Sequence, residues 1–185
     1  LQESIDAIKE ETANMKELVE QLLFLARGDS NRMPLNIERL DLQDIAAAVY
    51  KETEMIDGGH DFTIDTQPVF AEGDAGLIKQ ALRILVDNAI KYTPPGGKIK
   101  IMVSREYDKA RMIVQDNGIG IPPEAVPHVF ERFFRADESR ARATGGTGLG
   151  LSIAKWIVER HGGHMEILSR EDVGTRVSIV LPAAD

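Results

Sequence analysis

The sequence contains no cysteine, which excludes disulfide bonds and thiolate metal sites and is compatible with a reducing compartment. It also has no apolar run long enough to span a membrane and no signal-peptide pattern. An excess of basic residues is missing too, since the formal net charge is -8 and the pI is near 5.1. Nonspecific binding to nucleic acid or to anionic membranes needs a basic surface, so we expect no nucleic-acid partner.

The 185 residues suggest one domain, or one domain with an appendage. Hydrophobic residues make up 43% of the chain, which is enough for a buried core, and the 28% of charged residues is ordinary for a globular protein. The first residue is Leu1 rather than Met, so we expect a fragment or a processed product.

Two glycine-rich stretches are the most informative part of the sequence: residues 116–121 (DNGIGI) and residues 145–152 (GGTGLGLS). Glycine is kept where the backbone must turn sharply or approach a ligand closely. The second stretch leads into a helix-like segment, which places free N–H groups and a positive helix end where a polyphosphate can bind. Asp116 opens the first stretch, and its carboxylate can accept a hydrogen bond from an amino group such as that of adenine. The two loops together predict a nucleotide site.

Two common phosphate-binding motifs fail at a single residue. In a P-loop that runs from Gly145 to Ser152, Leu151 occupies the place of the phosphate-binding lysine. In a Rossmann fingerprint that starts at Gly146, Leu151 replaces the third glycine. The remaining alternative is that the glycines only form turns and a helix entry. That alternative explains one loop as well as a ligand does, but it explains both loops poorly.

Residues 1–27 have a sustained heptad pattern and are predicted to form one long helix, which the stretch Gly28-Asp29-Ser30 ends. Apolar positions alternate four and three residues apart, which is the period of a coiled coil or helical bundle. These positions are Leu1, Ile5, Ile8, Thr12, Met15, Val19, Leu22 and Ala26. Leu18, Leu23 and Leu25 widen the apolar face near the end, which indicates a further contact there. The alternative is an amphipathic helix packed on its own domain.

Helices and strands are both predicted in the rest of the chain. Asp41 and Asp74 are candidate N-caps, Pro94 and Pro95 stop the second helix, and a third helix starts at Leu149. The predicted helices cover residues 42–55, 75–92 and 149–160, and the predicted strands cover residues 35–42, 61–66, 69–72, 98–105, 110–115, 164–169 and 175–181. We therefore expect an α+β two-layer sandwich, with a mixed and mostly antiparallel sheet backed by three helices.

The predicted helix 75–92 carries Asn88, Lys91 and Tyr92, which share one face because they are three and four residues apart. An amide oxygen can ligate Mg²⁺, a lysine can neutralise phosphate, and a tyrosine ring can pack on a base. Each residue alone is better explained as an ordinary surface side chain. Followed by two glycine loops, the three together favour a nucleotide and magnesium site.

Four motifs, taken in order, resemble the ATP-binding domain of sensor histidine kinases of two-component systems. They are DNAIKYTP (87–94), DNGIGI (116–121), FERFFR (130–135) and GGTGLGLSIA (145–154). In this order they are similar to that family's N box, first glycine box, F box and second glycine box. The resemblance covers about residues 36–182 and implies the Bergerat-type fold of the GHKL superfamily.

The N-terminal helix fits the same resemblance. Its heptad and its LLFLAR ending are similar to the second helix of the family's dimerisation and phosphotransfer hairpin. The resemblance thus implies three parts: residues 1–27 as that helix, residues 28–35 as a linker, and residues 36–185 as the ATP-binding catalytic domain.

The resemblance implies a role for each matching residue. Asp116 would receive the adenine amino group, Asn88 would hold Mg²⁺, and Lys91 and Tyr92 would flank phosphate and adenine. The implied nucleotide-binding residues are Asn88, Lys91, Tyr92, Asp116, Gly118, Gly120, Ile121, Arg132, Arg135, Thr147, Gly148, Leu149, Gly150 and Thr175. Residues 135–147 would form a mobile ATP lid, whose Arg135, Arg140 or Arg142 could reach phosphate and which Phe130, Phe133 and Phe134 would anchor.

The resemblance implies a protein histidine kinase with ATP and Mg²⁺ as cofactors. None of the four histidines has the family's phospho-acceptor context, so the catalytic acceptor is expected on a segment absent from this chain. The implied whole protein is a homodimeric, membrane-anchored phosphoprotein. Its cytoplasmic portion would include this chain and would pass the phosphate to a response regulator.

One departure from the family is Ile84, which stands four residues before Asn88, where a second asparagine is usual. Related ATPases of the same superfold place a general-base glutamate there. Isoleucine can neither ligate a metal nor take a proton, which argues against an ATPase motor. The alternative that remains is an ATP-binding regulatory module that controls a phosphatase or partner without phosphoryl transfer.

Overall fold

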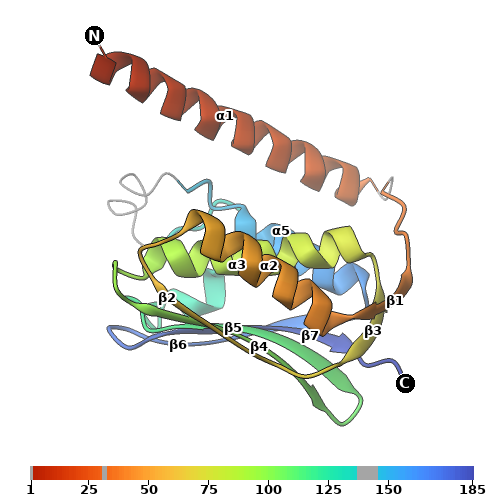
Figure 1. Ribbon diagram of the computed structural model, residues 1–185. Helices are drawn as coiled ribbons and strands as arrows, with labels where there is room; N and C mark the ends of the chain where they lie inside the picture. Colours follow the sequence, from red (N-terminus) through yellow and green to blue (C-terminus); the bar gives the residue numbers. More distant parts are fainter. Residues whose placement is uncertain (1, 31–32, 137–145) are drawn as a thin grey trace.

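The chain after the N-terminal helix folds into two layers, a five-stranded sheet and the helices α2, α3 and α5 on one of its faces (Figure 1). This computed structural model describes residues 2–30, 33–136 and 146–185. The elements are α1 (Gln2–Asp29), β1 (Glu38–Asp41), α2 (Leu42–Ile56), β2 (Asp61–Thr66), β3 (Phe70–Gly73), α3 (Ala75–Tyr92), β4 (Lys98–Glu106), β5 (Lys109–Asp116), the 3-10 helix η1 (Val126–His128), α5 (Gly150–Arg160), β6 (His164–Arg170) and β7 (Gly174–Pro182).

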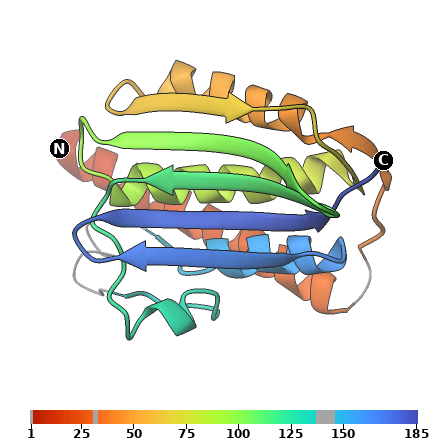
Figure 2. The same cartoon turned by 90° about the horizontal axis from the view of Figure 1, so that it is seen from below.

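The sheet order is β2-β4-β5-β7-β6. The edge strand β2 runs parallel to β4, and the other neighbours are antiparallel. Figure 2 shows the sheet face that the helices leave uncovered. The predicted α+β sandwich with a mixed, mostly antiparallel sheet backed by three helices is therefore confirmed.

Local sequence explains where the helices begin. The Asp41 side chain caps α2 by accepting a hydrogen bond from the Gln43 N–H at 2.9 Å. Asp74 caps α3 in the same way through the Leu77 N–H at 3.1 Å. Both predicted caps are confirmed, and Asp74 fixes the start of α3, the helix that carries the N box.

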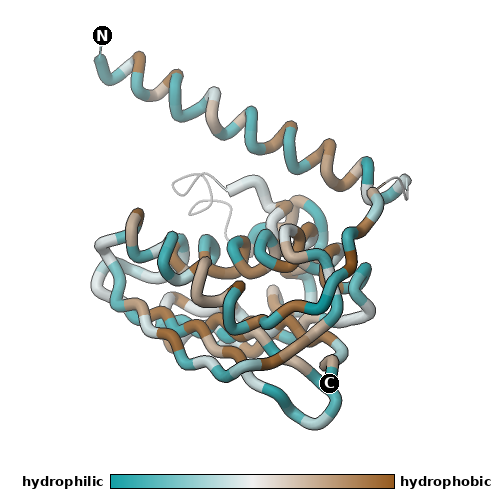
Figure 3. Tube along the Cα trace, turned by 45° about the vertical axis from the view of Figure 1, so that its right-hand side comes forward, coloured by the Kyte–Doolittle hydropathy of each residue, from teal (hydrophilic) through white to brown (hydrophobic). Residues whose placement is uncertain are grey.

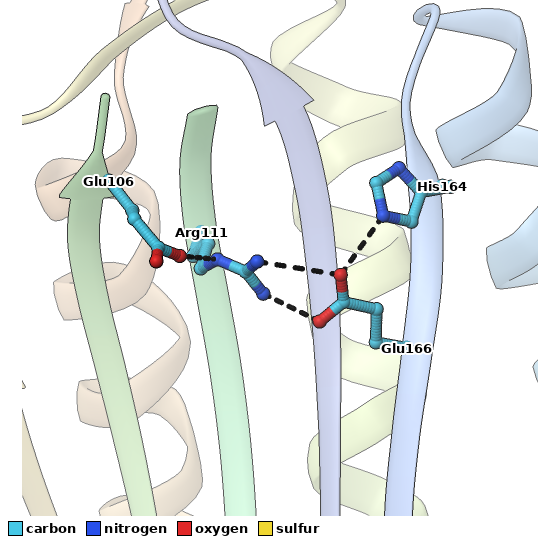
Figure 4. A network of polar contacts seen from close by, with 4 residues as sticks. All are labelled: Glu106, Arg111, His164 and Glu166. Carbon is cyan, nitrogen blue, oxygen red and sulfur yellow. Dashed lines mark hydrogen bonds and ion pairs between the residues drawn. The ribbon is translucent and has the colours of Figure 1, made fainter. Parts of the chain in front are cut away.

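The core lies between the sheet and the helices. Every second residue of β4 and β5 points into it, for example Ile101 and Met112, which are fully buried in the same cluster as Leu82 of α3 and Ile157 of α5. The intervening residues face the uncovered side, where Arg111 of β5 reaches across to Glu166 of β6 (Figure 4). The side-chain alternation expected from the sequence is thus realised on both faces.

The first predicted strand is shorter than expected and belongs to a separate sheet. Only Glu38–Asp41 is extended and paired, and its partner is β3, in a two-stranded antiparallel ribbon. Leu35 and Ile37, which suggested the earlier start, lie before the strand. The register ends there because Glu38 already faces Gly73, the last residue of β3.

The N-terminal helix extends two residues past the predicted end at residue 27, through Gly28 and Asp29. Gly28 is buried in the helix because a Cβ there would lie 2.6 Å from the indole of Trp156, on α5. The glycine therefore permits close approach between helices and does not end α1. The ring of Phe24 also packs edge-on against Trp156, with centroids 5.2 Å apart.

Two different stripes run along α1. The stripe that faces the domain consists of Asn14, Leu18, Gln21, Leu25 and Gly28, each at least partly buried. The heptad positions predicted as a coiled-coil seam, such as Met15 and Val19, lie on the exposed side. Figure 3 shows hydrophobic residues recurring among hydrophilic ones along this helix. No helix of the described part of the chain has the length and apolarity needed to cross a membrane.

Candidate functional site

A cavity of about 600 Å³ lies where the N box, the two glycine loops and α1 meet. Eleven of the predicted site residues line it: Asn88, Lys91, Tyr92, Asp116, Gly120, Ile121, Arg135, Thr147, Gly148, Gly150 and Thr175. They come from α3, from the end of β5, from β7, from the start of α5 and from the loops between β5 and α5. Segments up to 87 residues apart in sequence, from Asn88 to Thr175, therefore converge on one pocket, as the motifs predicted.

Asp116 ends β5 at one side of the cavity. Its Oδ1 accepts the backbone N–H of Gly118 at 2.8 Å and that of Thr175 at 3.2 Å. Burial raises the pKa of this carboxyl, and the two N–H donors oppose that rise because they favour the ionised form. Both bonds end at Oδ1, and among the described residues Oδ2 has no hydrogen-bond partner, which suits an amino donor from a ligand.

The first glycine loop is shaped by close backbone approaches. A Cβ on Gly118 would collide with the carbonyl oxygen of Tyr92, and one on Gly120 would collide with that of Arg170. Gly120 also has a φ of +68°, a conformation that glycine adopts without strain. The glycines of this loop thus hold the end of α3 and the β6–β7 turn beside Asp116.

Lys91 and Asn88 lie one turn apart on α3 and both line the cavity. The second glycine loop meets them, since a Cβ on Gly146 would collide with the Lys91 ammonium group. Burial, together with the nearby Arg135, lowers the pKa of Lys91, while Glu17 of α1 opposes this. A half-buried cation beside a glycine that leaves it space matches the chemistry of phosphate binding.

The F box fixes the second glycine loop. The Phe133 N–H donates to the Gly148 carbonyl at 2.9 Å, and both residues have positive φ, +65° and +75°. A Cβ on Gly148 would lie 2.9 Å from the Phe133 backbone. Leu149 follows as a fully buried anchor at the start of α5, where it packs into the core. The loop is thereby held at the helix N-terminus.

Three predicted residues lie outside the cavity wall. Gly118 is buried behind the end of α3, and Leu149 is buried under α5. Arg132 donates from both terminal nitrogens to the carboxylate of Asp29 in α1, at 2.9 and 2.8 Å. Arg132 is thus engaged with the N-terminal helix, a contact that no local sequence pattern predicts. Arg140, Arg142 and most of the predicted lid fall outside the described residues.

The helix α1 supplies wall residues that the sequence did not reveal. Asn14, Glu17 and Gln21 share one helix face and line the cavity. The hydroxyl of Thr147, in the second glycine loop, also donates to the Gln21 side chain. Three polar residues on a charged helix look like a solvated face, so no sequence signal would have identified them.

Magnesium must be tested against the donors that are present. Among the described residues, no three His, Asp, Glu or Cys side chains gather in a way that could hold a metal ion. Ile84 is packed against the core beneath Gly150, so it leaves Asn88 without the second amide usual in the family. Mg²⁺ typically takes one or two protein oxygens with phosphate and water, and Asn88 alone fits such a site.

Comparison with known proteins shows the family to which the chain belongs. Residues 73–185 match the family described as "Histidine kinase-, DNA gyrase B-, and HSP90-like ATPase". That match covers more than half of the chain, and the chain therefore belongs to this family.

The relatives place it on the histidine kinase side of the family. YkoH, a sensor histidine kinase of Bacillus subtilis, is 41% identical over 97% of this chain and 39% of its own length. WalK of the same organism is 38% identical over 93% of this chain and 29% of its own length. The chain thus spans well under half of these relatives. It carries the ATP-binding catalytic domain of a sensor histidine kinase, and the regulatory-module alternative is not favoured.

Solved structures agree with this assignment. The catalytic domain of histidine kinase ThkA superposes with a TM-score of 0.69 at 34% identity, over 80% of this chain and 97% of that one. The mycobacterial sensor histidine kinase MprB gives 0.69 at 30% identity, over 79% and 97%. Full-length ShkA in complex with AMPPNP, at 23% identity, shares the fold, with a TM-score of 0.81 over 99% of this chain and 39% of its own.

Proposed function

We propose that this chain binds ATP in the 600 Å³ cavity and presents its γ-phosphate to a histidine on a segment outside the chain. The observation that carries this proposal is the convergence of Asp116, Lys91 and the two glycine loops on one pocket. The phosphorylated histidine then passes its phosphate to an aspartate of a response regulator.

The proposed nucleotide pose follows the chemistry of the wall. Asp116 accepts the adenine amino group through Oδ2, and Thr175, whose N–H already bonds Oδ1, lies beside it. Lys91 and the N-terminus of α5 bind the phosphates, because both offer positive charge or free N–H groups there. Tyr92, 38% exposed at the rim, flanks the base.

Asn88 is the proposed ligand of Mg²⁺, which supplies charge neutralisation at the phosphates. Phosphoryl transfer depends mainly on positioning and electrostatic stabilisation, so this half of the enzyme needs no general base of its own. That requirement is compatible with Ile84, which can take no proton. The chain's residues therefore hold and orient the nucleotide, and the acceptor segment brings its own proton chemistry.

The organisation of the whole protein is also proposed. Residues 1–27 would be the second helix of the dimerisation and phosphotransfer hairpin, residues 28–35 a linker and residues 36–185 the catalytic domain. The exposed heptad seam of α1 would then pack in a homodimer, in the cytoplasmic portion of a membrane-anchored phosphoprotein.

Calorimetric titration with a non-hydrolysable ATP analogue, with and without Mg²⁺, tests the nucleotide site. We expect micromolar binding that strengthens with Mg²⁺. A histidine-bearing hairpin of the same protein, added in trans with ATP, should then become phosphorylated in an acid-labile form. Binding without phosphorylation would instead restore the regulatory-module alternative, and absence of binding would refute both.

The dimer proposal has a separate test in the chain extended by its own hairpin. Val19→Glu places a charge in the exposed seam and should shift sedimentation toward the monomer. Lys9→Glu, a charge change on the same helix outside the seam, is the matched control. Equal sedimentation of the two variants would count against the seam.

A further inference from the structure

His60 lies just before β2, with only 7% of its side chain exposed. Its Nδ1 is 2.7 Å from Oδ2 of Asp57, and its Nε2 is 2.7 Å from the carbonyl oxygen of Thr93. Both partners are acceptors. A neutral imidazole carries only one N–H, so making both bonds at once requires the charged imidazolium.

The position of the ring favours that charge for a second reason. Asp57 is the C-cap of α2 and Thr93 is the C-cap of α3, so the ring lies at the C-terminal ends of two helices. Helix C-termini carry partial negative charge and stabilise a cation. Phe62 of β2 packs edge-on beside the ring. Among the described residues, Asp57 is the charged group within hydrogen-bond reach.

The balance of these effects favours the protonated ring. Burial alone lowers the pKa of His60, but the hydrogen bonds to the Thr93 carbonyl and to Asp57 outweigh burial and raise it above its ordinary value. The imidazolium is therefore retained to a higher pH than on an exposed histidine.

A continuous set of contacts leads from His60 to the cavity. Thr93 follows Tyr92, whose carbonyl oxygen accepts the Ile119 N–H at 3.1 Å. Gly118, one residue earlier, packs so closely against this segment that a Cβ would lie 2.8 Å from the Thr93 hydroxyl oxygen. The N–H of Gly118 in turn bonds Asp116. The end of α3 is thus held between His60 on one side and the Asp116 loop on the other.

We propose that His60 is a positioning residue that makes nucleotide affinity depend on pH. As an imidazolium it fixes the Tyr92–Thr93 segment against the loop that carries Asp116. After losing its proton it can keep only one of its two bonds, and the end of α3 gains freedom relative to Asp116. Nucleotide binding therefore weakens as pH rises through the titration of His60. This inference rests on the proposed function, because it needs the nucleotide at Asp116.

The first experiment uses the unaltered chain, so no variant can fail to fold. The His60 ring is followed by NMR from about pH 5.5 to about pH 8.5, the range in which histidines titrate, with and without saturating ADP. Reciprocity requires that if the protonated form binds roughly fivefold more tightly, ADP raises the His60 midpoint by about 0.7 pH unit. The exposed His164 is the internal control, and its midpoint should stay in place.

The second experiment compares variants by ADP titration at both ends of that pH range. His60→Gln has one uncharged NH2 donor group, which can replace only one of the two ring donors, so the variant should bind ADP roughly fivefold more weakly than the unaltered chain at low pH, and equally at high pH. Titration of the ADP phosphates is common to both proteins and cancels in the ratio. His164→Gln should match the unaltered chain throughout.

The outcomes separate the inference from the function on which it rests. ADP binding with no change in the His60 midpoint would overturn the inference and leave the proposed function intact. A His60→Gln ratio that stays constant with pH would do the same. Absence of ADP binding at every pH would overturn both.

Discussion

Asp116 is the residue on which the proposed recognition of adenine depends. Asparagine can still accept the N–H groups of Gly118 and Thr175, but its remaining amide nitrogen is a donor and would face the donor group of adenine. Asp116→Asn should therefore weaken ATP binding by about tenfold or more, the size of one buried polar group left unpaired. Isothermal titration measures this. Asp108→Asn, in the exposed β4–β5 turn, is the control. Equal losses in the two variants would refute the adenine contact.

Gly118 and Gly146 should respond differently to the same substitution. In Gly118→Ala the new methyl group meets the Tyr92 carbonyl, which is backbone and cannot move away, so the free energy of unfolding should fall by about 2 kcal/mol, within the range for overpacking. In Gly146→Ala it meets the end of the flexible Lys91 side chain, so stability should be retained. Urea unfolding measures both.

The affinity of Gly146→Ala provides the second half of this test. A displaced Lys91 ammonium group should weaken ATP binding by a few tenths to about 1 kcal/mol, the size of a half-exposed charge contact. Adenosine binding should stay unchanged, because adenosine has no phosphate. If the affinities for ATP and adenosine fall together, Gly146 shapes the base pocket and Lys91 does not bind phosphate.

At the residue scale, the sequence predicted well where a residue's role follows from its neighbours in the chain. Asp41 and Asp74 were recognisable as caps because capping involves the next three residues. The actual partner of Arg132 was not predictable, since Asp29 is 103 residues away. Gly28 was misread for the same reason, because Trp156 lies on an element that folds against α1 only in the tertiary structure.

At the element scale, a network of polar side chains links strands on the uncovered face of the sheet. Arg111 donates to Glu106 at 2.9 Å and to Glu166 at 2.6 Å, and His164 lies 3.1 Å from the same Glu166 carboxylate (Figure 4). The Arg111 side chain crosses β7 to reach β6, so the network joins β4, β5 and β6 on the face that the helices leave uncovered.

Glu166 should make stability depend on acid pH. The hydrogen bond from Arg111, and then that from His164, hold the pKa of Glu166 below its ordinary value of 4.5. A lowered pKa contributes stability above the unfolded-state value, and that contribution is lost as pH falls through the folded-state value. Glu166→Gln should thus cost about 1 kcal/mol at neutral pH, since the carboxylate is partly exposed, and less at an acid pH below the folded-state pKa.

Urea unfolding at the two pH values measures the effect of Glu166→Gln, with the exposed Glu124→Gln as control. A loss of equal size at both pH values would show that packing of the side chain, and not its charge, supports the sheet edge.

The alternation of apolar and polar residues predicted which segments form strands, but it did not predict how the strands pair. The ranges 61–66 and 98–105 were predicted as strands because alternate residues are apolar, and β2 and β4 occupy these ranges with one residue added to β4. Their parallel pairing, and the separate pairing of β1 with β3, join segments that lie far apart in the sequence, which alternation within one strand does not reveal. Four-residue strands such as β1 also carry too little periodicity to fix their ends.

At the scale of the whole molecule, the cavity belongs to two parts of the chain. Family motifs supply the walls from α3 to β7, and α1 supplies the remaining side through Asn14, Glu17 and Gln21. Glu17 is the negative member of this trio. Its charge opposes the lowering of the Lys91 pKa and contributes to raising the pKa of Asp87, so it acts electrostatically on residues of the pocket wall. Docking of α1 thus sets part of the electrostatic environment of the proposed nucleotide site.

Two deletions should show that only the second half of α1 docks. Residues 2–13 are exposed, whereas Leu18, Phe24, Leu25 and Gly28 pack on the domain. Removing residues 1–12 should leave the melting temperature unchanged. Removing residues 1–30 should lower it by roughly 2–4 °C for each kcal/mol lost.

The fluorescence of Trp156 shows whether a fall in melting temperature comes from losing the contact between α1 and α5. Deletion of residues 1–30 removes Phe24 and exposes the indole, so the emission should shift to longer wavelength in step with the fall in melting temperature. An unchanged emission would mean that α1 does not rest on α5 in solution. The wall formed by Asn14, Glu17 and Gln21 would then be absent as well, and the catalytic domain would bind its nucleotide in a pocket open on that side.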